Sequence, residues 1–325
     1  MAKLISVDLT NNKLCILEYT TTDGQMLSFK EDAFDAKIVS HTYADKGKII
    51  FDKPITAIRE FPFNIPVNLK SITIPDGVTT IGECAFWDCT SLTNVTIPNG
   101  VTTIGKWAFA HCESLTSISI PNSVTTIGYA AFGNCKSLTN VTIPNGVTTI
   151  GYEAFRYCDS LKEFKGKFAA DNGRCLIVDG VLNSFAIGCG ATDYTIPNSV
   201  TTIGNSAFGN CKSLTSITIP NIVTTIGHFT FFNCSSLTNI TIPNSVTTIG
   251  DGAFDNCKSL TSVTIGKGVS VIGEDAFQGC NIDTIVCCAK IPPKLYNSFD
   301  KFENLIVPTG CEEAYANSDW GKYLE

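Results

Sequence analysis

The chain lacks most features that indicate metal binding, nucleic-acid binding or a membrane span. Its three histidines are scattered and no Cys-x-x-Cys motif accompanies them, so we predict no metal site. The net charge of −7 argues against a nucleic-acid partner, which requires clustered lysine and arginine. No run of about 18 apolar residues is present, and we therefore expect no transmembrane helix and no membrane insertion.

Common catalytic motifs are missing as well. The nucleophile elbow GxSxG does not occur, and residues 266–268 (GKG) lack the spacing and the hydroxyl residue of a Walker loop. Residues 188–190 begin a GxG pattern but do not complete GxGxxG. These absences predict no enzyme activity, no catalytic residues and no cofactor.

Repetition is the dominant feature of what is present. The segment LTNVTIPNGVTTIGKWAFAHCE, residues 92–113, recurs almost unaltered with a period of 23 residues. A period between about 20 and 50 residues is typical of solenoids, in which each repeat packs on the next. An apolar content of 44% and a mean hydropathy of +0.16 exclude a disordered chain. One isoleucine keeps the spacing at Ile74, Ile97, Ile120 and Ile143, and again at Ile196, Ile219, Ile242 and Ile265.

Each repeat reads as two short extended segments and a turn. Residues 94–97 alternate between inward apolar and outward polar side chains, as a strand does. Residues 98–100 (PNG) bend the chain, and residues 101–104 form a second, β-branched segment. We expect residues 106–112 to form a single helical or 3₁₀ turn that places Phe109 in the core. One such unit cannot cover its own apolar edge, so the repeats must stack.

The pattern LxxVxIPxxVxxIGxxAFxxC resembles the leucine-rich repeat, and specifically the BspA-like subtype of bacterial and protist surface proteins. The resemblance covers roughly residues 55 to 308. It implies an α/β solenoid, a right-handed leucine-rich repeat superhelix that is β-rich with short helical turns. Members of that family act as adhesins or protein-binding surfaces, and the resemblance implies such a function here.

Both ends of the repeat array differ from its middle. We predict a small N-terminal β cap at 1–53, a solenoid at 54–301 and a C-terminal cap at 302–325, because terminal repeats would otherwise expose an apolar face. An irregular insert around 161–190 interrupts the period. Asp179 and Gly180 lie there between two apolar runs, which predicts a β-hairpin that projects from or covers the solenoid.

The cysteines do not read as a disulfide framework. Stacked repeats align the side chains of one register side by side, whereas a disulfide requires two Cβ atoms directed at each other. We therefore predict a ladder of buried free thiols. Eight of the 15 cysteines occupy this register: Cys89, Cys112, Cys135, Cys158, Cys211, Cys234, Cys257 and Cys280.

The localisation is suggested mainly by the resemblance. The N-terminal residues MAKLISVDLTNNKLC lack a basic segment followed by an apolar core, so they do not read as a secretory signal. Either the protein stays in the cytoplasm, or this is a mature form from which a signal has been removed. The resemblance favours the second, a cell-surface or secreted protein, although many free thiols fit poorly with an oxidising exterior.

Two surfaces compete as binding sites. The first surface comprises the two positions that follow the repeated glycine and the two that follow the repeated phenylalanine. Aromatic side chains are concentrated at these positions in the first half of the array. An exposed aromatic strip with an arginine is typical of a binding surface. The alternative is drift, with the rings lying flat over the core. The second is a small, polar column on the sheet face, which also fits simple β-propensity. The strip comprises Trp87, Trp107, His111, Tyr129, Tyr152, Arg156 and Tyr157, and the column includes Thr96, Ser119, Thr142, Thr218 and Thr241.

The leading hypothesis is therefore a non-enzymatic protein-binding solenoid, a cell-surface or secreted adhesin whose partner is a protein, for example of a host or the extracellular matrix. One alternative is a structural or self-assembling scaffold, which an uncovered apolar end would favour over a polar cap. Another is a carbohydrate-binding surface protein, motivated by the Trp and Tyr side chains. No oligomeric state is predicted.

Overall fold

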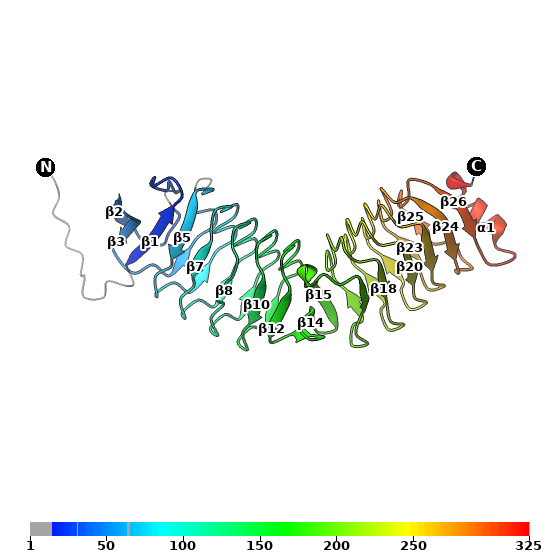
Figure 1. Cartoon of the computed structure of the whole chain (residues 1–325), viewed down its shortest axis with the longest axis horizontal. Helices are drawn as coiled ribbons and strands as arrows, with labels where there is room; N and C mark the ends of the chain where they lie inside the picture. Colours follow the sequence, from blue (N-terminus) through cyan, green and yellow to red (C-terminus); the bar gives the residue numbers. More distant parts are fainter. Residues whose placement is uncertain (1–14, 31, 64–65, 325) are drawn as a thin grey trace. The chain divides into compact units, whose positions relative to one another are not determined.

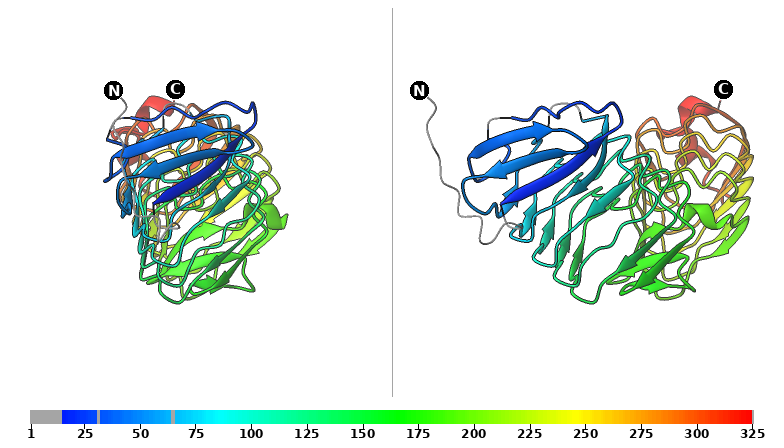
Figure 2. Two further views of the ribbon diagram at one scale, coloured as in Figure 1. Left: turned by 90° about the vertical axis from the view of Figure 1, so that its left-hand side faces the viewer. Right: turned by 60° about the vertical axis from the view of Figure 1, so that its left-hand side comes forward.

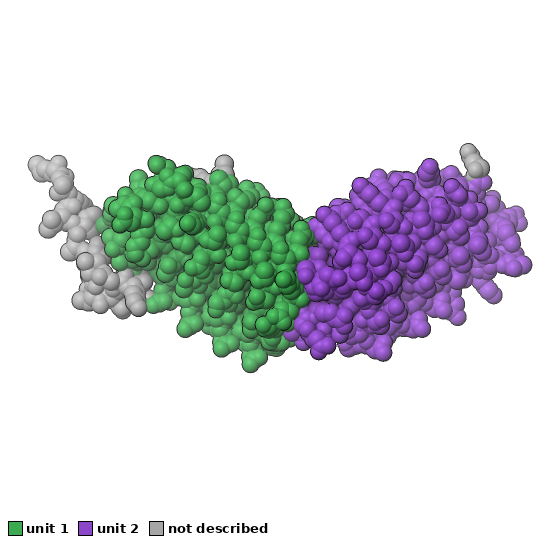
Figure 3. Space-filling model, in the orientation of Figure 1, with its two compact units in different colours: residues 1–168 green, residues 169–325 purple. Residues whose placement is uncertain are grey.

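The computed structural model describes residues 15–30, 32–63 and 66–324, and it confirms the predicted leucine-rich repeat solenoid (Figure 1). The described residues fall into two compact units that divide between Phe168 and Ala169 (Figure 3). This division lies within the insert predicted at 161–190. The predicted boundaries of the caps and the solenoid stay predictions.

Unit 1 begins with antiparallel strands and continues with parallel repeats. Strand β1 (Ile16–Thr21) pairs antiparallel with β3 (Gly47–Phe51) and with β5 (Leu69–Thr73). Strand β2 (Ile38–Tyr43) lies at the outer edge of this sheet, and β7 (Asn94–Thr96) at the other edge. Figure 2 shows these blue N-terminal strands beside the first repeats of unit 1. The sheet thus joins residues outside the repeat pattern to the first regular repeat.

A regular repeat such as residues 92–113 contributes one strand to each of two sheets, and it pairs in parallel with the neighbouring repeat in both. Ile72 pairs with Val95 in the first sheet, and Thr80 pairs with Thr103 in the second, so partners are 23 residues apart. Alternate side chains of the first sheet face the core, as in the sequence-based interpretation. The remaining strands of unit 1 are β4 (Ala57–Ile58), β6 (Thr80–Ile81), β8 (Thr103–Ile104), β9 (Thr126–Ile127), β10 (Asn140–Ile143), β11 (Thr149–Ile150), β12 (Glu163–Gly166).

The third side of each repeat differs from the expected helical or 3₁₀ turn. Trp107 and His111 have φ angles of 51° and 62°, which interrupt any helical run within residues 106–112. Their N–H groups donate to the carbonyls of Tyr129 and Gly133 in the next repeat, at 2.9 and 2.8 Å. The segment is therefore a chain of tight turns that forms a third hydrogen-bonded ladder between repeats.

Two parallel columns of side chains run through the core of unit 1. The rings of Phe86, Phe109 and Phe132 stack with centroids 5.0 and 5.4 Å apart. Beside them, the thiol of Cys135 donates to the carbonyl of Phe109 at 3.2 Å, and Cys158 repeats this contact one turn later. All eight cysteines of the register are buried and free, as the sequence predicted.

We expect thiol-specific alkylation to separate these cysteines by their environment. Burial raises the pKa of Cys135 and Cys158, so at pH 8 they stay protonated and unreactive, whereas Cys288 is exposed. Under native conditions maleimide should label Cys288 first, and the ladder only after unfolding. Peptide mass spectrometry with and without urea measures this order. Native labelling of Cys135 as fast as Cys288 would contradict the buried ladder.

Unit 2 begins with a hairpin that takes the place of a repeat strand. Strands β14 (Cys175–Val178) and β15 (Val181–Phe185) pair antiparallel around Asp179 and Gly180, whose φ angles of 49° and 78° suit a two-residue hairpin turn. Strand β15 pairs parallel with β17 (Thr202–Ile203). The expectation that the hairpin projects from or covers the repeats is therefore wrong, because β15 supplies ladder hydrogen bonds to the first repeat strand of unit 2.

The parallel strands of unit 2 again lie on two faces of the repeats. One face is a single sheet that includes the hairpin and begins at β13 (Ala169–Ala170), and the other carries the longer repeat strands, which form a two-stranded and a four-stranded sheet. The remaining strands are β16 (Asp193–Thr195), β18 (Ser216–Thr218), β19 (Thr225–Ile226), β20 (Asn239–Ile242), β21 (Thr248–Ile249), β22 (Ser262–Ile265), β23 (Val271–Ile272), β24 (Ile282–Cys287), β25 (Lys294–Leu295) and β26 (Phe302–Ile306).

Side chains of the last residues close the C-terminal end of unit 2. Helix α1 (Glu312–Ala316) carries Tyr315, whose hydroxyl donates to the carbonyl of Ala289 at 2.8 Å. The indole N–H of Trp320 donates to the carbonyl of Pro293 at 2.9 Å, and Trp320 is fully buried. A short 3₁₀ helix, η3 (Gly321–Tyr323), follows, and another, η2 (Ile187–Cys189), follows the hairpin. Tyr315 and Trp320 thus cover apolar side chains at this end, and the carbonyls of Ala289 and Pro293 have side-chain partners.

Candidate binding surface

The seven residues of the aromatic strip lie on the third ladder, the hydrogen-bonded tight turns of successive repeats. They are Trp87, Trp107, His111, Tyr129, Tyr152, Arg156 and Tyr157. These residues follow the repeated glycine or phenylalanine, and the second position after each adopts positive φ in the described repeats of unit 1. Trp107, His111 and Tyr157 occupy such positions with φ of 51°, 62° and 55°. Bulky residues rarely adopt this conformation, so the surrounding hydrogen bonds must hold it. The strip therefore has a rigid backbone.

Several rings of the strip meet edge to face. The rings of Trp107 and Tyr129 lie 5.4 Å apart at 87°, and those of Trp87 and His111 lie 6.2 Å apart at 74°. Trp87 is 44% exposed and Tyr152 is 56% exposed, whereas Trp107 and Tyr129 are half-buried. The structure thus brings four of the predicted residues together in pairs and leaves two large rings open to solvent.

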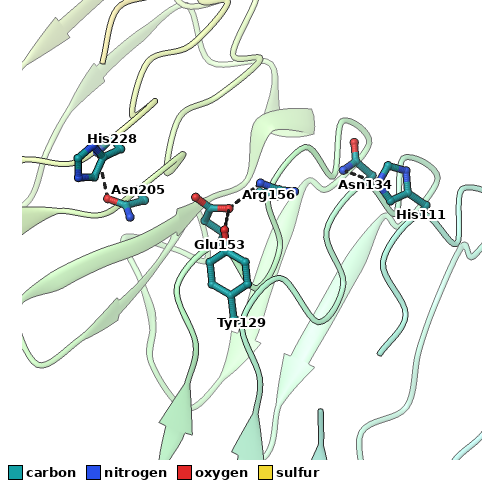
Figure 4. A network of polar contacts seen from close by, with 7 residues as sticks. All are labelled: His111, Tyr129, Asn134, Glu153, Arg156, Asn205 and His228. Atoms are coloured by element: carbon teal, nitrogen blue, oxygen red, sulfur yellow. Dashed lines mark hydrogen bonds and ion pairs between the residues drawn. The ribbon is translucent and has the colours of Figure 1, made fainter. Parts of the chain in front are cut away.

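A buried carboxylate connects Tyr129 to Arg156 (Figure 4). The Tyr129 hydroxyl donates to Oε2 of Glu153 at 2.7 Å, and Nη1 of Arg156 forms an ion pair with the same oxygen at 2.7 Å. Burial, followed by the hydrogen bond to Glu153, raises the pKa of Tyr129 to about 12, so its hydroxyl remains a donor at neutral pH. The guanidinium carbon of Arg156 lies 5.7 Å from the ring centroid of Tyr157.

Sequence reasoning missed Glu153, although one signal for it was present. Its side chain is only 7% exposed, and it lies three residues before Arg156, a spacing at which opposite charges meet in a tight turn. A glutamate three residues before an arginine, in a segment rich in aromatic residues, would have indicated the ion pair between Glu153 and Arg156. His111 has a weaker polar contact, with Nε2 3.5 Å from Nδ2 of Asn134 (Figure 4).

A pocket of about 450 Å³ lies at the N-terminal end of the strip. The rings of Phe61 and Trp87 meet there at 76° with centroids 6.2 Å apart, and Nζ of Lys30 lies 5.0 Å from the Phe61 centroid. Asp88 and the buried Cys84 also line the pocket. Phe61 was not singled out because it stands in a degraded repeat. Its signal was its register: it lies 46 residues before Trp107, or two repeats.

The equivalent positions in unit 2 carry a different set of contacts. The Asn205 side chain accepts the N–H of His228 at 3.0 Å, and Nδ1 of His228 accepts the N–H of Asp251 at 3.0 Å (Figure 4 shows the first pair). Asp251 in turn accepts the N–H of Glu274 at 2.9 Å. In unit 2, side chains directly after the repeated glycine therefore accept hydrogen bonds from backbone N–H groups of the next repeat. In unit 1, Tyr129 and Tyr152 carry aromatic rings at the same position.

The second predicted surface is exposed but offers little chemical variety. In unit 1, Thr96 continues a column from Thr73, its strand partner, and both are exposed. Small hydroxyl side chains give few of the anchors that concentrate binding energy, which favour Trp, Tyr and Arg. The remaining predicted members are likewise exposed: Ser119, Thr142, Thr218 and Thr241.

Within the described ranges, no group of three or more His, Cys, Asp or Glu side chains is arranged to hold a metal ion. No helix in the described part of the chain is long and apolar enough to cross a membrane.

Comparison with known proteins identifies the repeat. The family described as "BspA type Leucine rich repeat region" matches residues 45–169 and 182–306, with six copies. A leucine-rich repeat protein from Eubacterium ventriosum is 23% identical, with 90% of this chain and 85% of that chain covered and a TM-score of 0.66. The pneumococcal vaccine antigen PcpA is 19% identical, with 79% and 86% covered and a TM-score of 0.53. No curated protein sequence matches.

Proposed function

Because the chain belongs to the BspA type leucine-rich repeat family, we propose that it is a non-enzymatic module that binds a protein partner along the aromatic strip. Repeats of this family commonly mediate protein interactions and are generally scaffolds without catalytic function. The observation that supports this choice of surface is the exposure of Trp87 and Tyr152 on a hydrogen-bonded backbone ladder. Such side chains are the residue types that concentrate binding energy in protein interfaces.

The strip is preorganised, which favours tight binding. Its rings restrict one another through edge-to-face contacts, and Glu153 holds Tyr129 and Arg156 through one shared carboxylate oxygen. Side chains that are already ordered lose less conformational entropy on association, so more of the contact energy appears as affinity. The sheet face with Thr96, Ser119 and Thr142 serves as a secondary surface in this proposal.

We also propose a location at the cell surface or outside the cell, with a host or extracellular-matrix protein as the partner. Family membership supports this assignment, since the resemblance described above implies a surface protein that acts as an adhesin or a protein-binding surface. The covered C-terminal end of unit 2 supports a binding module over an end-to-end scaffold. Tyr315 and Trp320, 1% and 0% exposed, cover the last apolar layer.

The test is to remove the two most exposed rings of the strip. Trp87→Ala combined with Tyr152→Ala should weaken partner binding by about tenfold or more, because exposed aromatic anchors typically contribute at least about 1 kcal/mol each. Binding is measured by biolayer interferometry against a panel of purified extracellular-matrix and serum proteins. The matched control is Ile222→Ala, which removes a 48% exposed apolar side chain of unit 2.

Two results would count against the proposal. One is a panel in which no protein binds the parent chain, and the other is a partner that binds the double variant as tightly as the parent. The melting temperature of the double variant should stay within a few degrees of the parent, as surface substitutions usually change stability little.

A further inference from the structure

We propose that one edge of unit 2, the row of turns between its two faces of parallel strands, docks onto a bilayer that contains anionic phospholipid. The contact is peripheral: lysines meet the phosphate groups and isoleucine side chains enter the interface, without a membrane-spanning segment. The sequence-based expectation of no membrane insertion rested only on the lack of an apolar run long enough to span a bilayer. This contact lies outside the aromatic strip and does not depend on the protein partner proposed above.

The turn edge of unit 2 is a row of short turns in register. In each repeat, a turn leads from a longer strand to the short strand on the other face, and the short strands β19, β21, β23 and β25 pair in parallel. Each turn ends three residues before its short strand and contains two residues: 221–222, 244–245, 267–268 and 290–291. Their sequences are Asn-Ile, Asn-Ser, Lys-Gly and Lys-Ile.

Two lysines of the turn edge reinforce each other. Lys267 and Lys290 occupy the same position in successive repeats, and both side chains are exposed. Adjacent repeats lie close together here, with 4.9 Å between the ring centroids of Phe254 and Phe277. Within the described ranges neither ammonium group forms an ion pair. Because the repeat spacing is shorter than the Debye length of about 8 Å at physiological salt, the two charges produce a local positive potential.

No carboxylate stands in these four turns. Asp251 follows a repeated glycine and belongs to the third ladder. Asp319 approaches β25 but accepts a backbone N–H of that strand at 3.2 Å. Asp179, in the hairpin turn, lies four steps of backbone hydrogen bonds before the repeat of Lys267. The net charge of −7 is therefore carried away from the two lysines, and the turn edge is locally basic.

Two isoleucines place apolar groups on the same edge. Ile291 is 83% exposed, and Ile222, three repeats earlier in the same register, is 48% exposed. A single exposed apolar side chain is ordinary, but two in one register beside lysines form a surface. Pro292 and Pro293 follow Ile291, and the carbonyl of Pro293 accepts the indole N–H of Trp320 at 2.9 Å. The backbone next to Ile291 is therefore restrained.

A hollow of about 470 Å³ brings the charged and apolar groups together. Lys267, Lys290 and Ile291 line it, together with Val269 and Cys288. In a phospholipid, the phosphate lies directly above the acyl chains. Ammonium groups beside an apolar hollow match that arrangement, because charge attraction and apolar burial then act at one place.

The composition of the turn edge favours a lipid surface over a protein. Lysine is depleted in protein interfaces, and their hot spots favour Trp, Tyr and Arg, none of which stands in the four turns. Lysines mixed with exposed apolar side chains are typical of binding to anionic bilayers. The corresponding turns of unit 1 carry neither lysine nor a large apolar residue: 76–77, 99–100, 122–123 and 145–146.

Cosedimentation of the full chain with sucrose-loaded vesicles tests this inference. One set of vesicles contains phosphatidylglycerol and phosphatidylcholine in equal parts, and the other contains phosphatidylcholine alone. We expect saturable binding to the first set and none to the second, and binding should weaken as salt is added because salt screens exposed charges. Absence of binding to the anionic vesicles at low ionic strength would overturn the inference.

Reversing the two lysines tests the role of charge. Lys267→Glu combined with Lys290→Glu should lower the partition coefficient by about tenfold or more, because each lysine near an anionic surface contributes about fivefold. The matched control is Lys212→Glu with Lys258→Glu, which changes the net charge equally at two exposed lysines that follow ladder cysteines. Equal losses in the two double variants would show that overall charge governs binding, and would overturn the site.

Ile291→Ala tests the apolar contact. This variant should lower the partition coefficient several-fold, because less apolar surface leaves water on binding. The control Ile306→Ala removes a 53% exposed isoleucine of β26 and should bind as the parent does. The variants should melt within a few degrees of the parent, as surface substitutions usually do. Parent-like binding of Ile291→Ala would mean that attraction of charges alone holds the chain, and would overturn the proposed docking.

Cys288 provides a reporter inside the site. Its thiol is exposed, and the residue lines the hollow with Lys290 and Ile291. Anionic vesicles that cover the turn edge should slow maleimide labelling of Cys288 several-fold, whereas phosphatidylcholine vesicles should leave the rate unchanged. An unchanged rate in the vesicle-bound protein would place the contact elsewhere and overturn the assignment. Either failure leaves the aromatic strip as the proposed protein-binding surface, because the test of that strip uses residues of unit 1 and no lipid.

Discussion

Replacing Phe132 by alanine is expected to lower the free energy of unfolding by about 4 kcal/mol, since removing a fully buried phenylalanine typically costs about 3–5 kcal/mol. Phe132 is fully buried and stacks between Phe109 and Phe155, with centroids 5.4 and 5.3 Å away and interplanar angles of 0° and 4°. The cavity would lie between two repeats, so both adjacent interfaces lose contacts. Urea denaturation followed by circular dichroism measures the change.

The position of Phe132 within the array adds a second expectation. Solenoid stability is approximately a sum over neighbouring repeats, so a weakened central interface should also reduce cooperativity and broaden the transition. Tyr152→Ala is the matched control, because that aromatic side chain is 56% exposed and its loss should change stability by less than about 1 kcal/mol. Similar losses for the two variants would contradict a core built on the stacked phenylalanines.

Replacing Gly128 by alanine is expected to destabilise the protein by about 3 kcal/mol or more, as an overpacked site does when the surrounding backbone cannot yield. A Cβ atom at Gly128 would lie 2.6 Å from both the carbonyl carbon of Gly105 and the amide nitrogen of Lys106. These are backbone atoms of the preceding repeat, held in the ladder by hydrogen bonds such as Gly128 N–H to Ile104 O at 2.8 Å. Thermal and urea denaturation both report the loss.

Gly24 provides the control for this experiment. It has a φ of 70° and no atom within 4 Å of an added Cβ, so Gly24→Ala tests backbone strain without a clash. Its expected cost is about 1 kcal/mol, that of a non-glycine residue in the left-handed region. A Gly128 variant that loses no more than the Gly24 variant would show that the repeats can separate at this point at little cost.

The candidate surface was only partly predictable. Its aromatic residues follow from the repeat alignment, because Trp87, Trp107 and Tyr129 replace smaller residues found in other repeats. Their pairing does not, because ring contacts depend on χ angles and on the positive φ at Trp107. The same limit explains why Glu153 was missed, because its side chain is held by Tyr129 of the preceding repeat and by Arg156 three residues later. Phe61 was missed because its repeat departs from the consensus.

The sequence by itself determined the stacked repeats, their 23-residue register, the inward-facing phenylalanines and the ladder of free thiols. These follow because a strictly periodic apolar pattern can be buried in one way only, by placing each repeat on its neighbour. Only the tertiary structure decided that residues 106–112 form a third ladder with left-handed residues and that the hairpin at β14 and β15 starts the sheet of unit 2. Both depend on hydrogen bonds between residues far apart in the chain, which local propensity does not encode.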